Sequence, residues 1–223
     1  MKDLETENLR IRKFKIEDAE DIYKNLAIDR RLEDCLGYNV HQSVEQTRKM
    51  ISSYIYEYEA DELSQNSIRA IYADSQGGMW CGTYYEADEL VWALEEKQNN
   101  SVVGYINALE FSDFNKYCNI KFGIALKFIE KHYMEEALTR VLEYIFNEKD
   151  FNMVVSEFCD GNKQVNDFKT TILEKLGMKK EAVLRNRKIN EKTGLEENQV
   201  IYSITKDEFL ELNKIREHQC VLL

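Results

Sequence analysis

The N-terminal part of the chain shows two kinds of hydrophobic periodicity. Apolar and basic residues alternate over residues 7–14, which is the period of a half-buried strand. Over residues 16–27, apolar residues recur at helical spacing behind acidic residues that suit a helix N-terminus. A second helix is predicted from Ser43 to Tyr58, because Ser43 is a good N-cap and a glutamine follows three residues later.

Residues 60–89 have no clear hydrophobic period and contain Gly77, Gly78 and Gly82. Three aromatic residues, Trp80, Tyr84 and Tyr85, are mixed into this polar segment. Such a segment is typical of a surface insertion or a lid over a pocket, so no helix or strand is assigned to it. A loosely packed surface excursion is the alternative.

Strong periodicity returns at residue 89 and continues to the end of the chain. The pattern predicts a hairpin, a strand, a long helix, a strand, a helix and two closing strands, with a short helical tail from about residue 206. Gly177 ends the second of these helices, because glycine readily takes the left-handed conformation after a last helical turn. The predicted order therefore defines an α+β fold with a mostly antiparallel central sheet. The predicted ranges are 89–97, 102–111, 118–126, 133–147, 151–159, 165–177, 178–189 and 198–206.

Length and composition indicate a single globular domain over residues 1–223. The hydrophobic fraction of 43% is ordinary for such a domain, and no segment approaches a membrane span. The N-terminus carries acidic residues where a signal peptide needs a basic flank. Five scattered cysteines give neither a disulfide framework nor a zinc pattern, so a reducing, cytoplasmic location and no metal are predicted.

The formal net charge of −11 disfavours nucleic acid as a partner and favours cationic partners such as amines or basic peptides. The alternative is that this charge only keeps the protein soluble. The chain ends in Cys220-Val221-Leu222-Leu223, which matches a prenylation box, but no polybasic stretch precedes it and a chance match is the alternative.

Four phrases of the sequence, in order, are similar to motifs of one enzyme family. They are VVGYINAL from residue 102, KHYMEEALTRVLEYIF from residue 131, ILEKLGMKKEAVLRN from residue 172 and IYSITKDEF from residue 201. Together with the opening strand and helix, they resemble the GNAT acetyltransferases, most closely the branch that acetylates ribosomal-protein N-termini and related amines. The resemblance implies that the strands 118–126 and 153–159 are parallel and splay apart, with helices on both faces of the sheet.

The resemblance also implies an acyl-CoA site with acetyl-CoA as the donor. Backbone groups of Gly123, Ile124 and Ala125 would pair with the pantetheine arm, and the loop before the helix 133–147 would hold the pyrophosphate. A helix N-terminus suits this task because its amides are unpaired and its dipole attracts anions. The candidate residues in this loop are Glu130, Lys131, His132, Tyr133 and Met134.

The loop departs from the family pattern, which has small residues where the backbone approaches phosphate. Glu130, His132 and Met134 occupy those positions. A glutamate carboxylate repels phosphate unless its side chain turns outward, while Lys131 and His132 could offset its charge. Basic residues on the solvated rim of a loop are the alternative.

The second contact region and the catalytic groups depart as well. The family's N-x-x-S falls on Asn166 and Lys169, where the lysine is a candidate phosphate contact and the asparagine is either a ligand contact or the N-cap of its helix. Many relatives carry a glutamate base where this chain has Asn119, and others a tyrosine acid where it has Leu173. The nearest remaining carboxylate, Glu110, is the candidate catalytic base, with a solvated strand-end charge as the alternative.

Two hypotheses follow. In the first, the chain transfers an acyl group from acyl-CoA to a primary amine of a small molecule or protein N-terminus. In the second, it is a degenerate member of the fold that has lost turnover and serves as a binding or regulatory module. The sequence is compatible with a homodimer under both hypotheses.

Overall fold

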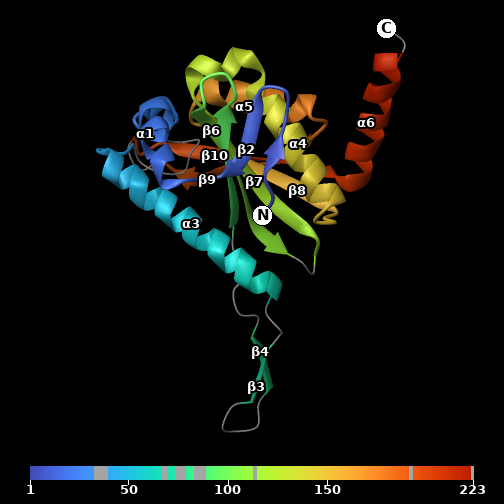
Figure 1. The fold of residues 1–223 in the computed structure, drawn as a ribbon. Coiled ribbons are helices and arrows are strands. Elements are labelled where there is room, and N and C mark those ends of the chain that lie inside the picture. The colour runs from blue at the N-terminus through green and yellow to red at the C-terminus, as the bar shows by residue number, and fades with distance from the viewer. Residues whose placement is uncertain are drawn as a thin grey trace.

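The computed structural model describes residues 1–32, 40–66, 70–73, 79–82, 89–112, 115–190 and 193–221. An eight-stranded sheet in the order β1-β2-β5-β6-β7-β8-β10-β9 forms the centre (Figure 1). Neighbouring strands are antiparallel except β7 and β8, which are parallel. The strands are β1 (Leu4–Glu5), β2 (Leu9–Lys13), β5 (Glu89–Glu96), β6 (Ser101–Ser112), β7 (Tyr117–Ile124), β8 (Met153–Cys159), β9 (Lys179–Ile189) and β10 (Glu196–Thr205).

Helices cover both faces of this sheet, as predicted (Figure 1). One face carries α1 (Ala19–Ile22), flanked by a 3-10 turn (Ile16–Asp18) and a π turn (Tyr23–Ala27), together with α3 (Val44–Asn66). The other face carries α4 (Tyr133–Asn147) and α5 (Lys163–Lys175). The short 3-10 turn η3 (Arg30–Leu32) follows the π turn, and a second one, η4 (Leu126–Lys131), leads from β7 to α4. Helix α6 (Lys206–Val221) follows β10.

Two apolar clusters hold these layers together. The cluster under α4 and α5 contains the largest buried side chains, among them Trp92 and Phe122. The cluster under α1 and α3 is centred on residues such as Ile22 and Ile51. The Tyr58 hydroxyl donates to the Val91 carbonyl at 2.6 Å and therefore fastens α3 to the sheet.

Apart from the end of the second helix, the helix and strand predictions outside residues 60–89 are confirmed, including the helical tail. Gly177 takes φ of +83°, and the Met178 amide donates back to the Leu173 carbonyl at 2.9 Å, which closes α5 as the sequence predicted. The Ser43 hydroxyl accepts a hydrogen bond from the Gln46 amide at 3.4 Å and so caps α3.

The predicted end of α3 at Tyr58 was wrong, because the helix continues to Asn66. The added residues are polar and lack an apolar stripe, but glutamate, alanine and leucine among them are good helix formers. Strands β3 (Ala70–Ala73) and β4 (Met79–Gly82) form a separate antiparallel pair, and Trp80 lies in β4. Tyr84, Tyr85 and the last two residues, 222–223, lie outside the described residues, so the lid and the prenylation box stay untested.

Candidate functional site

The parallel strands β7 and β8 separate part of the way along their length. Their register contains only the pairs Tyr117–Met153, Cys118–Val154 and Asn119–Val155. One residue further, the Ser156 hydroxyl donates to the Ile120 carbonyl at 3.0 Å and makes a last link through a side chain. The rest of β7, up to Ile124, has no backbone pairing with β8 within the described residues. This splayed pair, with α4 as the connection, confirms the predicted architecture.

A narrow cleft, partly open to solvent, follows this separation. On its far side β7 is held by β6, through the pairs Gly104–Ile124 and Tyr105–Gly123. The predicted residues Gly123 and Ile124 line the cleft, whereas the Ala125 amide donates to the Val103 carbonyl of β6 at 2.9 Å. The cleft is lined by Leu32, Phe122, Gly123, Ile124, Leu126, Ile129, Gln164, Val165, Phe168 and Lys169.

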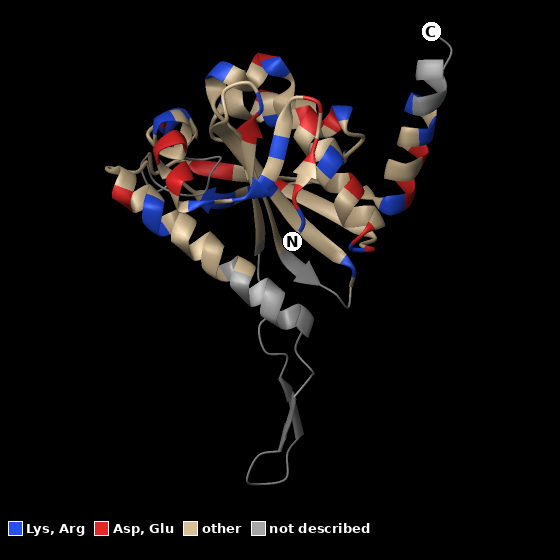
Figure 2. Cartoon of the chain, in the orientation of Figure 1, with Lys and Arg blue, Asp and Glu red and all other residues tan. Residues whose placement is uncertain are grey.

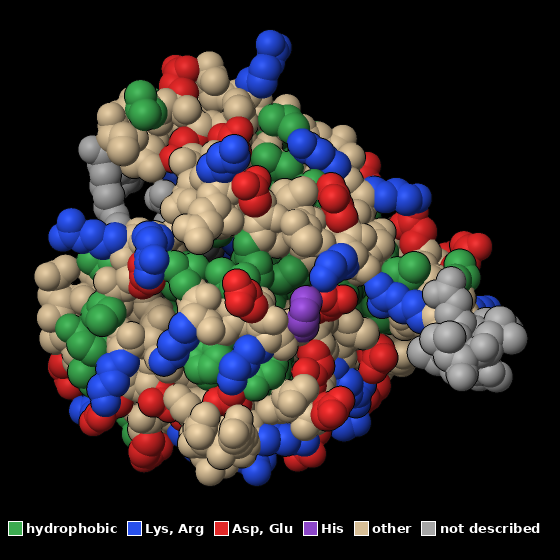
Figure 3. Space-filling view, turned by 90° about the horizontal axis from the view of Figure 1, so that it is seen from above, with side chains coloured by type: hydrophobic (Ala, Val, Ile, Leu, Met, Phe, Trp, Pro, Cys, Tyr) green, Lys and Arg blue, Asp and Glu red, His purple; other side chains and the backbone are tan. Residues whose placement is uncertain are grey.

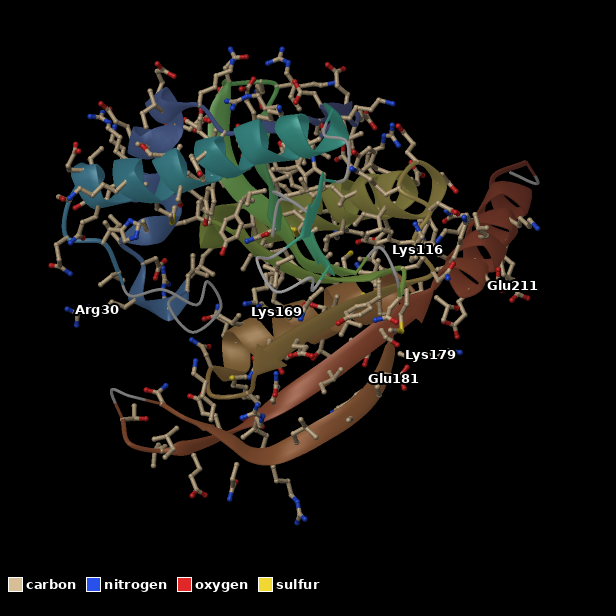
Figure 4. All side chains as sticks on the ribbon, turned by 90° about the horizontal axis from the view of Figure 1, so that it is seen from below. Arg30, Lys116, Lys169, Lys179, Glu181 and Glu211 are labelled. Atoms are coloured by element: carbon tan, nitrogen blue, oxygen red, sulfur yellow. The ribbon has the colours of Figure 1, made fainter. Side chains whose placement is uncertain are left out.

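Lys169 extends from α5 into this cleft (Figure 4). Its side chain is buried, and its ammonium lies 5.6 Å from the ring centre of Phe122 and 5.5 Å from that of Phe158. Cation–π attraction to two rings favours the charged amine in this position. Lys169 therefore lies between the separating strands, and its contact with a CoA phosphate stays a prediction.

The loop before α4 adopts an unusual backbone conformation for its sequence. Turn η4 ends at His132, which takes φ of 58° and ψ of 12° in the left-handed region. This conformation disfavours residues with a Cβ, and His132 stands at one of the glycine positions of the family pattern. No side chain of the described residues caps α4, so its first-turn amides are available to an anion.

The side chains of this loop divide into exposed and buried ones. Glu130 and His132 are exposed, as an outward-turned glutamate requires. Tyr133 and Met134 are buried in the core under α4. Figure 3 shows this side of the molecule, where apolar side chains in the middle are surrounded by acidic and basic ones.

Lys131 and Tyr133 are fastened to a buried carboxylate at the end of β5. The Lys131 ammonium lies 2.8 Å and the Tyr133 hydroxyl 2.7 Å from Glu96 Oε1, and Glu96 is 1% exposed. Burial alone would raise the pKa of Glu96, but the hydrogen bonds from Lys131, Tyr133 and Asn99 outweigh it and hold this pKa below its ordinary value. Lys131 therefore anchors the loop to the sheet, and its approach to a phosphate stays a prediction.

The alternative role of Asn166 as a helix cap was wrong. Asn162 is the N-cap of α5, because its side chain accepts from the Val165 amide at 3.3 Å. Asn166 lies in the first turn and donates its amide to the Asn162 carbonyl at 2.9 Å. The sequence offers an asparagine at both positions, and the chain begins its helix at the earlier one.

The predicted catalytic groups are placed only in part. Glu110 lies in β6, but its side chain is outside the described residues, so its role as a base stays a prediction. Leu173 is fully buried in the core. Sequence reasoning missed Glu96 and Ser156, because their partners are far away in the sequence and no local pattern marks them.

The sequence matches the model of the acetyltransferase (GNAT) domain over residues 8–179. The chain therefore belongs to the GNAT acetyltransferases and is an N-acetyltransferase. A search of curated proteins finds no match.

Solved structures of acetyltransferases share this fold at low sequence identity. A GCN5-related N-acetyltransferase from Brucella melitensis is 12% identical, with a TM-score of 0.71 over 96% of this chain and 82% of that chain. Ribosomal-protein-S5-alanine acetyltransferase from Vibrio fischeri is 13% identical, with a TM-score of 0.67 over 94% of this chain and 99% of that chain. Spermidine N-acetyltransferase from Vibrio cholerae, solved with CoA and spermine, is 15% identical, with a TM-score of 0.66 over 92% and 99%.

The described residues contain neither a metal-ligand cluster nor a membrane-spanning helix. Within the described ranges, no group of three or more His, Cys, Asp or Glu side chains is arranged to hold a metal ion. None of the helices in the described part of the chain combines the length and apolar character that crossing a membrane requires.

Proposed function

We propose that this protein transfers an acetyl group from acetyl-CoA to a primary amine of a small molecule or of a protein N-terminus. The observation that carries the proposal is the edge of β7 from Ile120 to Ile124, which β8 leaves unpaired beside an uncapped helix N-terminus. An extended chain with amide groups can pair with such an edge as an additional strand. The pantetheine arm of CoA is a chain of this kind.

The start of α4 fits a pyrophosphate in spite of its side chains. His132 takes a left-handed backbone conformation, which glycine adopts most readily, and the amides that follow it can still face an anion. Two glutamates of the first turn are already engaged. Glu135 lies 3.2 Å from the Lys175 ammonium, and Glu136 accepts the Asn8 amide at 2.8 Å. These contacts weaken the repulsion between the two carboxylates and a phosphate at the start of α4.

Acetyl transfer requires an unprotonated amine, donors for the oxyanion and a proton for the departing thiolate. Acetyl-CoA supplies the activated acyl group. We assign Glu110 as the base, on its position near the end of β6. Lys169 is a buried cation between the separating strands, and we assign it to a CoA phosphate, which its positive charge attracts.

The acceptor class follows from charge and from the fold. Acidic and basic residues are interspersed along the helices (Figure 2), but the net charge of −11 attracts cationic amines. A polyamine and a peptide with a free N-terminus both satisfy this condition. The cytoplasmic location and the homodimer remain predictions.

The proposal is tested by mixing the protein with acetyl-CoA and candidate acceptors and measuring the free thiol of CoA. We expect thiol release above the hydrolysis background with spermidine or with a peptide that begins with alanine or serine. Mass spectrometry of the acceptor then shows the added acetyl group. Binding of acetyl-CoA without transfer to any amine in a broad panel would favour a module that has lost turnover.

A further inference from the structure

One buried polar atom lies at the point where the two parallel strands part. Asn119 forms the last backbone pair of β7 with β8, opposite Val155. Its side chain is 4% exposed, and its carbonyl oxygen Oδ1 has no hydrogen-bond partner within the residues that the structure describes. A buried carbonyl without a donor destabilises the folded state, and nearly all such groups in native proteins are satisfied. Within the described part of the chain this oxygen therefore lacks a donor, and a ligand can supply one.

The sheet register fixes the side of the sheet on which this oxygen lies. Cys118, Ile120 and Phe122 belong to the apolar cluster under α4 and α5. Because side chains alternate along a strand, Asn119 faces the opposite side, the one that α1 and α3 cover. Asn107 of β6 is also buried and lies on the same face, two pairs away along the β6–β7 register. Two amide side chains thus give this point of the sheet a polar character.

The position of Asn119 relative to the cleft indicates which part of a ligand reaches it. The cleft is lined by residues from Phe122 to Leu126 of the β7 end and by the first half of α5. The uncapped start of α4 lies beyond that same end of β7. A donor that enters from α4 therefore presents its thioester, the far end of the arm, toward Asn119. The arm's own amides lie further back, beside Gly123 and Ile124.

We propose that Asn119 Oδ1 accepts a hydrogen bond from an N–H of the acceptor amine and so orients its nitrogen toward the thioester. This proposal rests on the proposed function. The new bond joins the amine nitrogen to the acetyl carbon, the bond from that carbon to sulfur breaks, one amine proton leaves to a base or water, and the thiolate takes up a proton. An amide oxygen cannot remove the proton, so Asn119 positions the amine and another group deprotonates it.

The first step of the test measures the free protein. Replacing Asn119 by leucine of similar volume removes the unsatisfied oxygen, so the thermal midpoint should rise by about 2 °C or more. The control is Ser156→Ala, which removes a hydrogen bond that is made and should lower the midpoint. A lower midpoint for Asn119→Leu would show that the oxygen has a partner in the free protein, and the proposal would be wrong.

The second step adds ligands to wild type, Asn119→Leu and Asn119→Asp. CoA should raise the midpoint of all three, and spermidine or propylamine should raise it further only in wild type and Asn119→Asp, which keeps an oxygen acceptor. Two results overturn this proposal alone. In one, the amine raises the thermal midpoint of Asn119→Leu as much as that of wild type. In the other, it does not raise the midpoint of CoA-bound wild type. A wild-type protein that CoA does not stabilise overturns the proposed function and this proposal with it.

Discussion

Replacing Gly104 by alanine should lower the free energy of unfolding by about 2–3 kcal/mol and weaken CoA binding. A Cβ at this position would lie 2.6 Å from the Gly123 carbonyl oxygen and 3.2 Å from the Ile124 Cα. Both are backbone atoms of the strand that lines the cleft, so they cannot move unless β7 moves with them. Urea denaturation measures the first effect, and calorimetric titration with CoA the second.

Gly194→Ala is the matched control. Gly194 takes φ of +69°, and a Cβ added there would have no other atom within 4 Å, so the change strains the backbone by about 1 kcal/mol and meets no neighbour. CoA affinity should stay unchanged, because Gly194 lies between β9 and β10. Equal CoA affinity of Gly104→Ala and wild type would contradict the role given to the β7 edge.

Replacing Glu96 by alanine should destabilise the protein by about 3 kcal/mol, because it leaves Lys131 and the Tyr133 hydroxyl without their buried acceptor. The loop before α4 should lose its anchor and CoA its binding site. Glu130→Ala in the same loop is the control, since an exposed carboxylate changes stability by no more than about 0.5 kcal/mol. Urea denaturation at neutral pH compares the two variants.

The contribution of Glu96 should also depend on pH. Its pKa is lower in the folded protein than the ordinary value of 4.5, so its stabilisation is complete above that value and is lost as the pH falls through the folded pKa. The difference in unfolding free energy between wild type and Glu96→Gln should therefore shrink below about pH 4.5. A difference that stays constant down to about pH 3 would show that the charge of Glu96 does not stabilise the fold.

The elements that the sequence predicts well are those whose apolar residues repeat with a clear period. The helix predicted at 133–147 agrees with α4 because one of its faces is buried against the sheet along its whole length. The end of α3 was missed for the opposite reason, since its last turns show no such face. Gly123 and Ile124 line the cleft, because the register of β6 and β7 fixes their place, and their pairing with pantetheine stays a prediction.

The site itself depends on contacts that no local pattern encodes. Glu96 carries no signal of its own in the sequence, because its partners Lys131 and Tyr133 lie far away along the chain. Asn119 is read as a lost base, whereas the structure shows a buried oxygen at the point of separation. His132 is read as a departure from a glycine motif, but its backbone takes a left-handed conformation, which glycine adopts most readily. Each of these conclusions depends on tertiary geometry.

Calorimetric titration of CoA into wild type and Glu130→Gly tests the central claim most directly. We expect the wild type to bind CoA and the variant to bind it more tightly, because the change removes a negative charge beside the phosphates and frees the backbone, although added chain entropy offsets part of the gain. No heat from either protein, at concentrations where a millimolar dissociation constant would be visible, would contradict the assignment of the β7 edge and the α4 N-terminus as the acetyl-CoA site.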